Sequence, residues 1–207
     1  MKILVVGDST GVSASHAEMP LGAFTGISPW TECVVAGQLL DEKFGPGAFT
    51  FVNKSKGGSG FGDWLYGSAE YGTQSFPDLI AQNPDVDLFY VQLGINNAIR
   101  GGTASGVSFA VGEMHRLVTA AGKKIMFATP NPVNYPGRPE VNDLLWTFKN
   151  AIESKCKELG IIVLNHWNAG AATGVWTKLL ADGIHPKEDY YRLKGQLLFM
   201  TLAYFNT

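Results

Sequence analysis

The chain has 207 residues, of which 45% are hydrophobic and 16% are charged, so it can bury a substantial core. This length predicts a single domain over residues 1–207. Sixteen Lys and Arg residues stand against eighteen Asp and Glu residues, a formal net charge of -2 with no long run of either sign. The chain therefore lacks the basic footprint of a protein that binds nucleic acid or an anionic membrane, and we expect small or neutral partners.

The N-terminal segment MKILVVGDST predicts a first strand and not a signal peptide. It runs from one Lys into a short apolar stretch without a small-residue cleavage site. No apolar run in the chain reaches the roughly 18 residues of a membrane span, so we expect no span and, by default, a cytoplasmic location. Cys33 and Cys156 lie far apart without metal-type spacing, which predicts core thiols and neither a disulfide framework nor a zinc site. Nothing in the sequence indicates the oligomeric state.

Five apolar stretches of strand length recur along the chain, with helical segments between them. In chain order they are Lys2–Val6, Phe49–Asn53, Asp87–Leu93, Lys124–Ala128 and Ile161–Leu164. Each is rich in Val, Ile, Leu and Phe without alternating polar residues, which is typical of a strand buried on both faces.

Apolar residues recur at intervals of three and four between these strands, which predicts helices. The longer helices are Trp30–Lys43, Ser105–Ala121, Val141–Leu159 and Glu188–Phe205, and the shorter ones are Phe76–Gln82 and Ala172–Leu180. Strands that alternate with helices form right-handed crossovers around a parallel sheet. We therefore predict an α/β fold, a flavodoxin-like three-layer α/β/α sandwich with a five-stranded parallel sheet.

Glycine and proline are concentrated in three segments that each follow a predicted strand: Thr10–Pro29, Ser55–Thr73 and Thr129–Arg138. These segments should gather at the carboxyl edge of the sheet, where open α/β proteins bind their ligands. The chain has no Walker A motif, no dinucleotide G-x-G-x-x-G and no zinc-type His/Glu spacing, so we expect neither a nucleotide cofactor nor a metal.

The first strand ends in Gly7-Asp8-Ser9-Thr10-Gly11, which matches the G-x-S-x-G nucleophile elbow of α/β-hydrolases. In that fold several strands precede the nucleophile, whereas this serine leaves the first strand, so its position argues against that fold. An ordinary strand-to-loop turn also favours Gly, Asp and Ser. The segment alone leaves a nucleophile and a plain turn equally open.

Near the C-terminus, Asp182 and His185 lie three residues apart. On a bent loop such a carboxylate and imidazole can hydrogen-bond, so one segment can supply a general base and the group that fixes its tautomer. The pattern D-x-x-H also occurs by chance as a structural or solvated pair. Pro186 favours an extended His185 with a helix starting just after it, which projects the ring from a loop.

Two further segments follow strands where an oxyanion hole would be needed. After the second strand, Gly57 and Gly58 allow a backbone N–H to approach a substrate closely. After the third strand, the side-chain amide of Asn96 can donate a second hydrogen bond. Each turn is common on its own, whereas the order of all these segments along one chain is not.

Together, these segments resemble the SGNH, or GDSL-like, hydrolase family over nearly the whole chain. That family has a G-D-S turn after the first strand, a Gly after the second, G-x-N-D after the third and D-x-x-H before the last helix. The resemblance implies that Ser9 is the nucleophile, His185 the base and Asp182 its orienting carboxylate. It also implies an oxyanion hole formed by the backbone N–H groups of Ser9 and Gly58 and the side chain of Asn96.

The sequence departs from the family pattern at two positions. Thr10 replaces the Leu of G-D-S-L, a change common among relatives and harmless to the chemistry. Asn97 replaces the Asp of G-x-N-D, which removes the carboxylate that would hold its loop but keeps the donor Asn96. We expect a change of support and not a loss of activity.

These motifs predict a metal-independent serine esterase that hydrolyses short acyl esters, with acetyl groups on a carbohydrate as the expected substrate. Flat aromatic side chains among Asn and Gly in the three loops suit sugar rings. The residues that we expect to contact substrate are Asp8, Trp30, Phe61, Trp64, Tyr135 and His166. The alternative for the rings is that they pack the loops onto the sheet, and for His166 that it is a plain loop residue.

Other functions stay open at this stage. A lysophospholipase or thioesterase would use the same residues on a lipid substrate. A carbohydrate-binding module could keep the fold without activity, although an intact Ser9, Asp182 and His185 argues against it. A flavodoxin-type cofactor binder would need a phosphate-binding loop after the first strand, where the acidic Asp8 disfavours phosphate.

Overall fold

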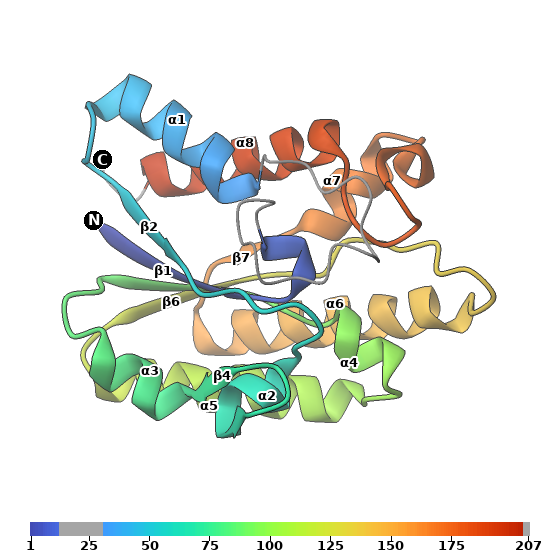
Figure 1. Cartoon of the computed structure of the whole chain (residues 1–207), viewed down its shortest axis with the longest axis horizontal. Coiled ribbons are helices and arrows are strands. Elements are labelled where there is room, and N and C mark those ends of the chain that lie inside the picture. Colours follow the sequence, from blue (N-terminus) through green and yellow to red (C-terminus); the bar gives the residue numbers. More distant parts are fainter. Residues whose placement is uncertain (13–30, 205–207) are drawn as a thin grey trace.

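Figure 1 shows the protein as a computed structural model that describes residues 1–12 and 31–204, with a parallel sheet between two layers of helices. The central sheet has five strands in the order β2-β1-β5-β6-β7, all parallel. Their bounds are β1 Lys2–Gly7, β2 Thr50–Asn53, β5 Leu88–Gln92, β6 Lys124–Ala128 and β7 Val163–Leu164. This is the flavodoxin-like strand order. The predicted fold class is therefore confirmed.

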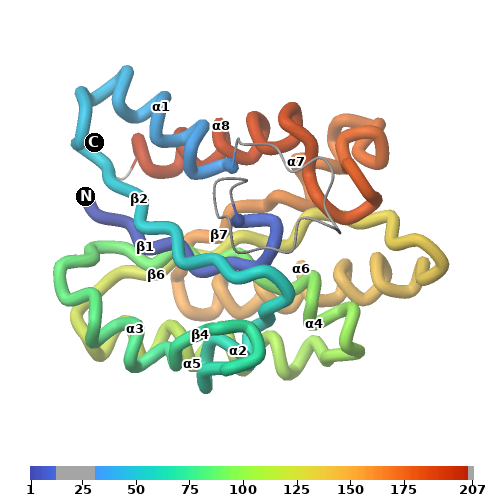
Figure 2. Tube along the Cα trace, viewed as in Figure 1, coloured from blue at the N-terminus to red at the C-terminus, as the bar shows by residue number. Residues whose placement is uncertain are grey.

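The helices divide between the two faces of the sheet, as the Cα trace in Figure 2 shows. One layer contains α1 (Glu32–Phe44), α7 (His166–Ala172) and α8 (Glu188–Tyr204). The other contains α2 (Phe61–Tyr66), α3 (Phe76–Gln82), α4 (Ile95–Ile99), α5 (Ala104–Ala120) and α6 (Glu140–Leu159). The remaining short elements are the 3-10 turns η1 (Ser9–Gly11) and η2 (Trp176–Leu179) and the antiparallel hairpin β3 (Gly67–Ser68) and β4 (Thr73–Ser75).

Each face of the sheet has its own hydrophobic core, because successive side chains of a strand point to opposite faces. Leu4 and Val6 of β1 pack toward the α2–α6 layer, and Ile3 and Val5 pack toward α1 and α8. All four side chains have no exposed surface. Burial on both faces explains why these strands are continuous apolar runs in the sequence.

Polar side chains fix the starts of several helices. The hydroxyl of Thr31 accepts a hydrogen bond from the Val34 N–H at the start of α1, and Thr103 does the same for Gly106 at the start of α5. Such caps satisfy backbone donors that have no partner within the helix. The four long helices α1, α5, α6 and α8 lie within about two residues of their predicted bounds.

The structure corrects two parts of the predicted element map. A helix was expected over Ala172–Leu180, but α7 begins at His166 because the Asn165 side chain accepts a hydrogen bond from the Asn168 N–H at 2.7 Å. Only the 3-10 turn η2 lies in the second half of the expected helix. The segment Ser55–Thr73, expected to be loop, contains α2 and most of the hairpin.

Both cysteines are free and buried, Cys33 in the core beside α8 and Cys156 in the core beside α5, as the sequence predicts. Across residues 1–12 and 31–204, no helix has the length and apolar character to cross a membrane.

Candidate active site

The proposed catalytic segments all leave the carboxyl ends of neighbouring strands. β1 lies between β2 and β5: the strand after β1 is added on one side of it, and the later strands of the sheet are added on the other side. In open α/β sheets such a switch point forms a crevice for ligands. Ser9 follows β1, Gly58 follows β2 and Asn96 follows β5, so these three residues begin on adjacent strands.

Ser9 is the first residue of η1, and Asp8 is the N-cap of this turn. The Asp8 Oδ1 atom accepts hydrogen bonds from the Thr10 N–H at 2.9 Å and the Thr10 hydroxyl at 2.8 Å. Burial raises the pKa of Asp8, and the two hydrogen bonds from Thr10 oppose that rise. Asp8 is only 1% exposed, and its carboxylate shapes the turn that presents Ser9. Its expected contact with substrate stays a prediction.

Ser9, His185 and Asp182 form a hydrogen-bonded series. The Ser9 Oγ atom lies 2.8 Å from His185 Nε2, and His185 Nδ1 lies 2.7 Å from Asp182 Oδ2. An ionised carboxylate can only accept, so Nδ1–H donates to Asp182 and Nε2 is left to accept the serine proton. A hydroxyl, an imidazole and a carboxylate in this order can generate a nucleophilic alkoxide. The structure thus brings together residues 176 positions apart in the sequence.

The loop that carries His185 is held at both ends. Leu180 and Pro186 form an isolated antiparallel bridge, and the Ala181 N–H donates to the His185 carbonyl at 2.8 Å. Between them, Gly183 has φ +87°, and a Cβ there would lie 2.3 Å from the Asn134 carbonyl oxygen. Only glycine fits this close approach, so Gly183 is required for the bend between Asp182 and His185.

Asp182 is held in its ionised form by its own loop. Partial burial acts to raise the pKa of Asp182, but hydrogen bonds from the His185 backbone and ring and from the Ile184 N–H outweigh it. The pKa of this carboxyl therefore lies below its usual value. Asp182 consequently stays charged around neutral pH, as a group that orients an imidazole must.

The loop after β2 is tied to the end of β1 and the start of α4. The Lys56 N–H and the Ser59 hydroxyl both donate to the Gly7 carbonyl, at 3.0 and 3.2 Å. The side-chain amide of Asn96 donates to the Ser59 carbonyl at 3.0 Å. These bonds bring the segments that contain Gly58 and Asn96 up to the serine turn.

Asn97, which departs from the family pattern, supports the same loop. Its Oδ1 atom accepts a hydrogen bond from the Phe61 N–H at 3.0 Å, and its carbonyl accepts one from the Gly102 N–H at 2.7 Å. An amide oxygen accepts such a bond as a carboxylate oxygen can. The neutral side chain therefore still links α4 to the start of α2.

Two aromatic residues expected to contact substrate belong instead to the core. Phe61 and Trp64 lie on α2, are each 2% exposed and pack in the cluster beneath α5 and α6. The Trp64 Nε1–H donates to the Ser59 hydroxyl at 3.0 Å. The expectation is wrong because α2 folds this Gly-rich segment against the sheet and buries its large rings.

Tyr135 follows β6, is partly buried against the same core and lies beside the Arg138 guanidinium, 5.9 Å from the ring centroid. It remains at the carboxyl edge of the sheet. Trp30 lies outside the described residues.

His166 is a buried helical residue, so the expectation of a plain loop residue is wrong. The expected contact with substrate stays a prediction. His166 is the first residue of α7, is 1% exposed, and its Nε2 atom lies 3.3 Å from the Tyr90 hydroxyl. Burial lowers the pKa of His166 to about 3, despite the opposing effect of Glu32, so the ring is neutral.

Sequence reasoning missed the buried polar cluster to which His166 belongs, formed by Glu32, Tyr90, His166 and Lys194. The Lys194 ammonium lies 2.7 Å from Glu32 Oε2, and the Tyr90 hydroxyl donates to Glu32 Oε1 at 2.5 Å. None of the four side chains is more than 1% exposed. Burial acts to raise the pKa of Glu32, but the Lys194 charge and the hydrogen bonds from Lys194 and Tyr90 outweigh it and lower the pKa.

Within the part of the chain that the structure describes, no group of three or more His, Cys, Asp or Glu side chains could hold a metal ion.

Comparison with known proteins identifies the group to which the chain is similar. A family model described as the GDSL-like Lipase/Acylhydrolase family matches residues 5–193. The match extends from β1 into α8, so it includes every segment of the site described above. A search of curated proteins found no match.

Several solved structures share the fold over almost their full length. A lipase/acylhydrolase from Enterococcus faecalis has 18% identity and a TM-score of 0.74, covering 97% of this chain and 94% of the other. An acetylxylan esterase from Geobacillus stearothermophilus has 16% identity and a TM-score of 0.74, covering 96% and 92%. A carbohydrate acetylesterase from Sinorhizobium meliloti has 12% identity and a TM-score of 0.73, covering 99% of each chain. At these identities the likeness shows the fold.

Proposed function

Because the chain belongs to the GDSL-like lipase/acylhydrolase family of esterase-type hydrolases, we propose that it cleaves carboxylic esters with Ser9 as nucleophile. His185 is the general base and Asp182 orients it. The observation that carries this proposal is the hydrogen-bonded series from Ser9 Oγ through the His185 ring to the Asp182 carboxylate, with contacts of 2.8 and 2.7 Å.

In the first half of the reaction, the Ser9 Oγ atom attacks the ester carbonyl carbon as its proton moves to His185 Nε2. The tetrahedral intermediate then collapses, the C–O bond to the alcohol breaks, and His185 returns the proton to the departing alcohol oxygen. In the second half, His185 takes a proton from water, the water oxygen attacks the acyl carbon, and Ser9 regains its proton as the acid leaves. Asp182 stays ionised throughout and stabilises the imidazolium.

The oxyanion formed in each half needs hydrogen-bond donors fixed in advance. We assign this role to the backbone N–H groups of Ser9 and Gly58 and to the side-chain amide of Asn96. One Asn96 amide hydrogen is directed to the Ser59 carbonyl at 3.0 Å, and an amide group has a second hydrogen to offer to the oxyanion.

The test of the nucleophile is Ser9→Ala measured beside Ser154→Ala, which removes an exposed serine hydroxyl on α6. With p-nitrophenyl acetate we expect Ser9→Ala to lose at least about 1,000-fold in kcat, as removal of a covalent nucleophile does. Ser154→Ala should match the wild type. A fluorophosphonate should label Ser9 of the wild type, as read by peptide mass spectrometry. Substantial turnover by Ser9→Ala, or labelling at another residue, refutes the mechanism.

For the substrate, we propose a short acyl group, in particular acetyl on a carbohydrate. Two of the similar structures are described as an acetylxylan esterase and a carbohydrate acetylesterase, and Tyr135 lies at the carboxyl edge of the sheet. The burial of Phe61 and Trp64 removes two rings from the case for a sugar site, so this part depends mainly on the likeness to those enzymes.

The substrate proposal is tested by a chain-length series of p-nitrophenyl esters together with acetylated xylo-oligosaccharides. We expect kcat/KM to fall from acetate to octanoate, and acetate to be released from the oligosaccharides by the wild type but not by Ser9→Ala. Higher activity on octanoate with no release of acetate contradicts the proposal and favours a lysophospholipase or thioesterase.

A further inference from the structure

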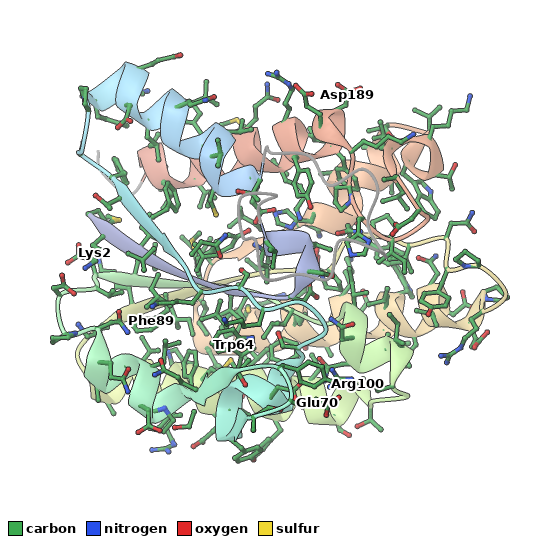
Figure 3. All side chains as sticks on the ribbon, in the orientation of Figure 1. Lys2, Trp64, Glu70, Phe89, Arg100 and Asp189 are labelled. Carbon is green, nitrogen blue, oxygen red and sulfur yellow. The ribbon has the colours of Figure 1, made fainter. Side chains whose placement is uncertain are left out.

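Arg100 links the two segments that supply the proposed oxyanion donors. It follows the last residue of α4, four positions after Asn96, and Figure 3 labels it on the same side of the sheet as Trp64. One guanidinium nitrogen of Arg100 donates to the Gly58 carbonyl, while the Asn96 amide donates to the next carbonyl, that of Ser59. Arg100 and Asn96 therefore bind two consecutive backbone carbonyl groups of the loop after β2, those of Gly58 and Ser59.

This loop needs restraint because its backbone is unusually free. Gly57 and Gly58 are adjacent, and Gly58 has φ +76°, a backbone conformation that residues other than glycine rarely adopt. Two glycines in sequence lose more conformational entropy on ordering than any other pair. An oxyanion donor is effective only when its direction is fixed before the reaction, so the direction of the Gly58 N–H must be set by contacts from outside the turn.

Tyr71, in the turn of the β3–β4 hairpin, closes the other side of Gly58. A Cβ built on Gly58 would lie 2.9 Å from the Tyr71 ring, so the ring packs directly against the glycine backbone. The Arg100 guanidinium lies over that ring, 4.5 Å from its centroid. Gly58 is thus held between an aromatic face and a hydrogen-bond donor, and the two holding groups also contact each other.

The guanidinium itself is fixed by Asp63 on α2. The Asp63 Oδ2 atom accepts from Arg100 Nη1 at 2.8 Å and from the Gly60 N–H at 2.7 Å. Arg100 therefore uses one nitrogen for Asp63 and the other for Gly58. A planar guanidinium can serve two acceptors and stack on a ring at the same time, which a lysine ammonium cannot do.

We propose that Arg100 is a positioning residue for the oxyanion hole: together with Tyr71 and Asp63 it fixes the Gly58 carbonyl and Cα, and thereby sets the direction of the Gly58 N–H in the preceding peptide group, so that this N–H faces the reacting carbonyl. This inference rests on the proposed function, since it assigns a role within that oxyanion hole. Charge on the carbonyl oxygen develops mainly in the transition state. Loss of Arg100 should therefore lower kcat in both acylation and deacylation and leave substrate binding almost unchanged.

The experiment compares Arg100→Met and Arg100→Lys with Arg116→Met, which removes an exposed arginine paired with Glu113 on α5. Removing an oxyanion donor costs about 100- to 1,000-fold in kcat. Arg100→Met misplaces the donor without deleting it, so we expect kcat on p-nitrophenyl acetate to fall by about 10-fold with KM within about twofold. Arg100→Lys should recover part of the loss because it keeps one donor, and Arg116→Met should match the wild type.

Two further readouts separate positioning from general stability. The rate at which a fluorophosphonate labels Ser9 should fall in parallel with kcat, because the phosphonyl oxygen occupies the oxyanion position. The ion pair of Arg100 is partly exposed, so its loss should lower Tm by no more than about 2–4 °C. Asp63→Asn, which keeps an acceptor for Gly60 but weakens the hold on Arg100, should give a smaller fall in kcat.

The proposal is overturned if Arg100→Met has the kcat of Arg116→Met, or if its loss appears in KM alone. It is also overturned if Arg100→Lys recovers nothing while both variants lose most of their thermal stability, because Arg100 would then only support the fold. Failure of the underlying mechanism gives a different result: Ser9→Ala would keep its activity whatever the Arg100 variants do.

Discussion

Lys194→Met should destabilise the protein strongly, because it leaves the Glu32 carboxylate buried without its counter-ion. The two charges lie 2.7 Å apart on α8 and α1, and neither side chain is more than 1% exposed. Their gross attraction over 2.7 Å is about 6 kcal/mol at an effective dielectric constant of roughly 20. The measured cost of removing one partner of such a pair is about 3–5 kcal/mol, since the attraction is partly offset by desolvation.

Little room exists for the structure to relax around the lost charge. Gly195, the next residue of α8, packs so closely on α1 that a Cβ there would lie 2.5 Å from the Val35 Cβ atom. At this point the two helices cannot move closer together. A loss of about 3–5 kcal/mol is a large share of the 5–15 kcal/mol typical of a whole protein.

The pH dependence follows from the sign of the pKa change at Glu32. In the wild type, Lys194 is the main group that holds the pKa of Glu32 below its usual value against the effect of burial. Without Lys194, burial dominates and raises the folded-state pKa above the unfolded value. A raised carboxyl pKa contributes stability at low pH that is lost as pH rises through the folded-state pKa. Lys194→Met should therefore be closer to the wild type at pH 5 than at pH 8.

The assay is urea unfolding followed by circular dichroism, with the double variant Glu32→Gln/Lys194→Met as the matched control. Glutamine still accepts from the Tyr90 hydroxyl but carries no charge, so the double variant should recover at least half of the loss. This recovery would appear as a coupling energy between the two sites. A single variant within about 1 kcal/mol of the wild type, or a double variant as unstable as the sum of both singles, refutes this reasoning.

Three further predictions concern the site and its surroundings. His185→Ala should lower kcat by about 1,000-fold or more and Asp182→Asn by less, because only the imidazole transfers the proton; if His166→Ala is as damaging as His185→Ala, the base is wrongly assigned. Asn96→Ala should lower kcat about 100-fold with little change in KM, whereas Asn97→Asp should be tolerated, and steady-state kinetics on p-nitrophenyl acetate check both. His166→Gln should reduce the loss of stability on acidification from pH 6.5 to 5. The folded His166 pKa of about 3 lies below the unfolded value of 6.5, so this group costs the wild type roughly 1.6 kcal/mol over that window, and equal slopes in urea titrations would contradict this.

The sheet was predictable from the sequence because a strand buried on both faces must be apolar throughout. β6 was predicted to the residue, and β1 and β2 lie within one residue of their predicted bounds. Among the elements that the sequence did not predict, α2 and α4 have six and five residues and are too short to display a helical period. The start of α2 is fixed by the Phe61 N–H, which donates to Asn97, and both helices pack on the sheet; neither contact is a local pattern in the sequence.

The proposed triad could be predicted from the sequence because its parts are local motifs. The burial of the aromatic rings could not be predicted in this way. Asp182 and His185 hydrogen-bond within one loop, and Ser9 occupies the turn directly after β1. Parallel strands then bring the two segments to one edge without any further signal in the sequence. Phe61 and Trp64, in contrast, lie in a Gly-rich segment that is typical of a surface loop, and only the docking of α2 on the sheet buries them.

The two charged residues of the buried cluster, Glu32 and Lys194, each interrupt the apolar stripe of a helix, and this is visible in the sequence once the helices are known. Lys194 follows Tyr190 and precedes Leu198 by four residues each, so it occupies the apolar stripe of α8. Glu32, the first residue of α1, precedes Ala36 by four residues and Leu40 by eight, so it begins the apolar stripe of that helix. A single charge in such a stripe predicts an opposite charge on the helix packed against it, because an unpaired buried charge would cost more than the fold can sustain. The two interruptions therefore indicate that α1 and α8 are neighbours, a tertiary contact that the spacing of apolar residues alone does not predict.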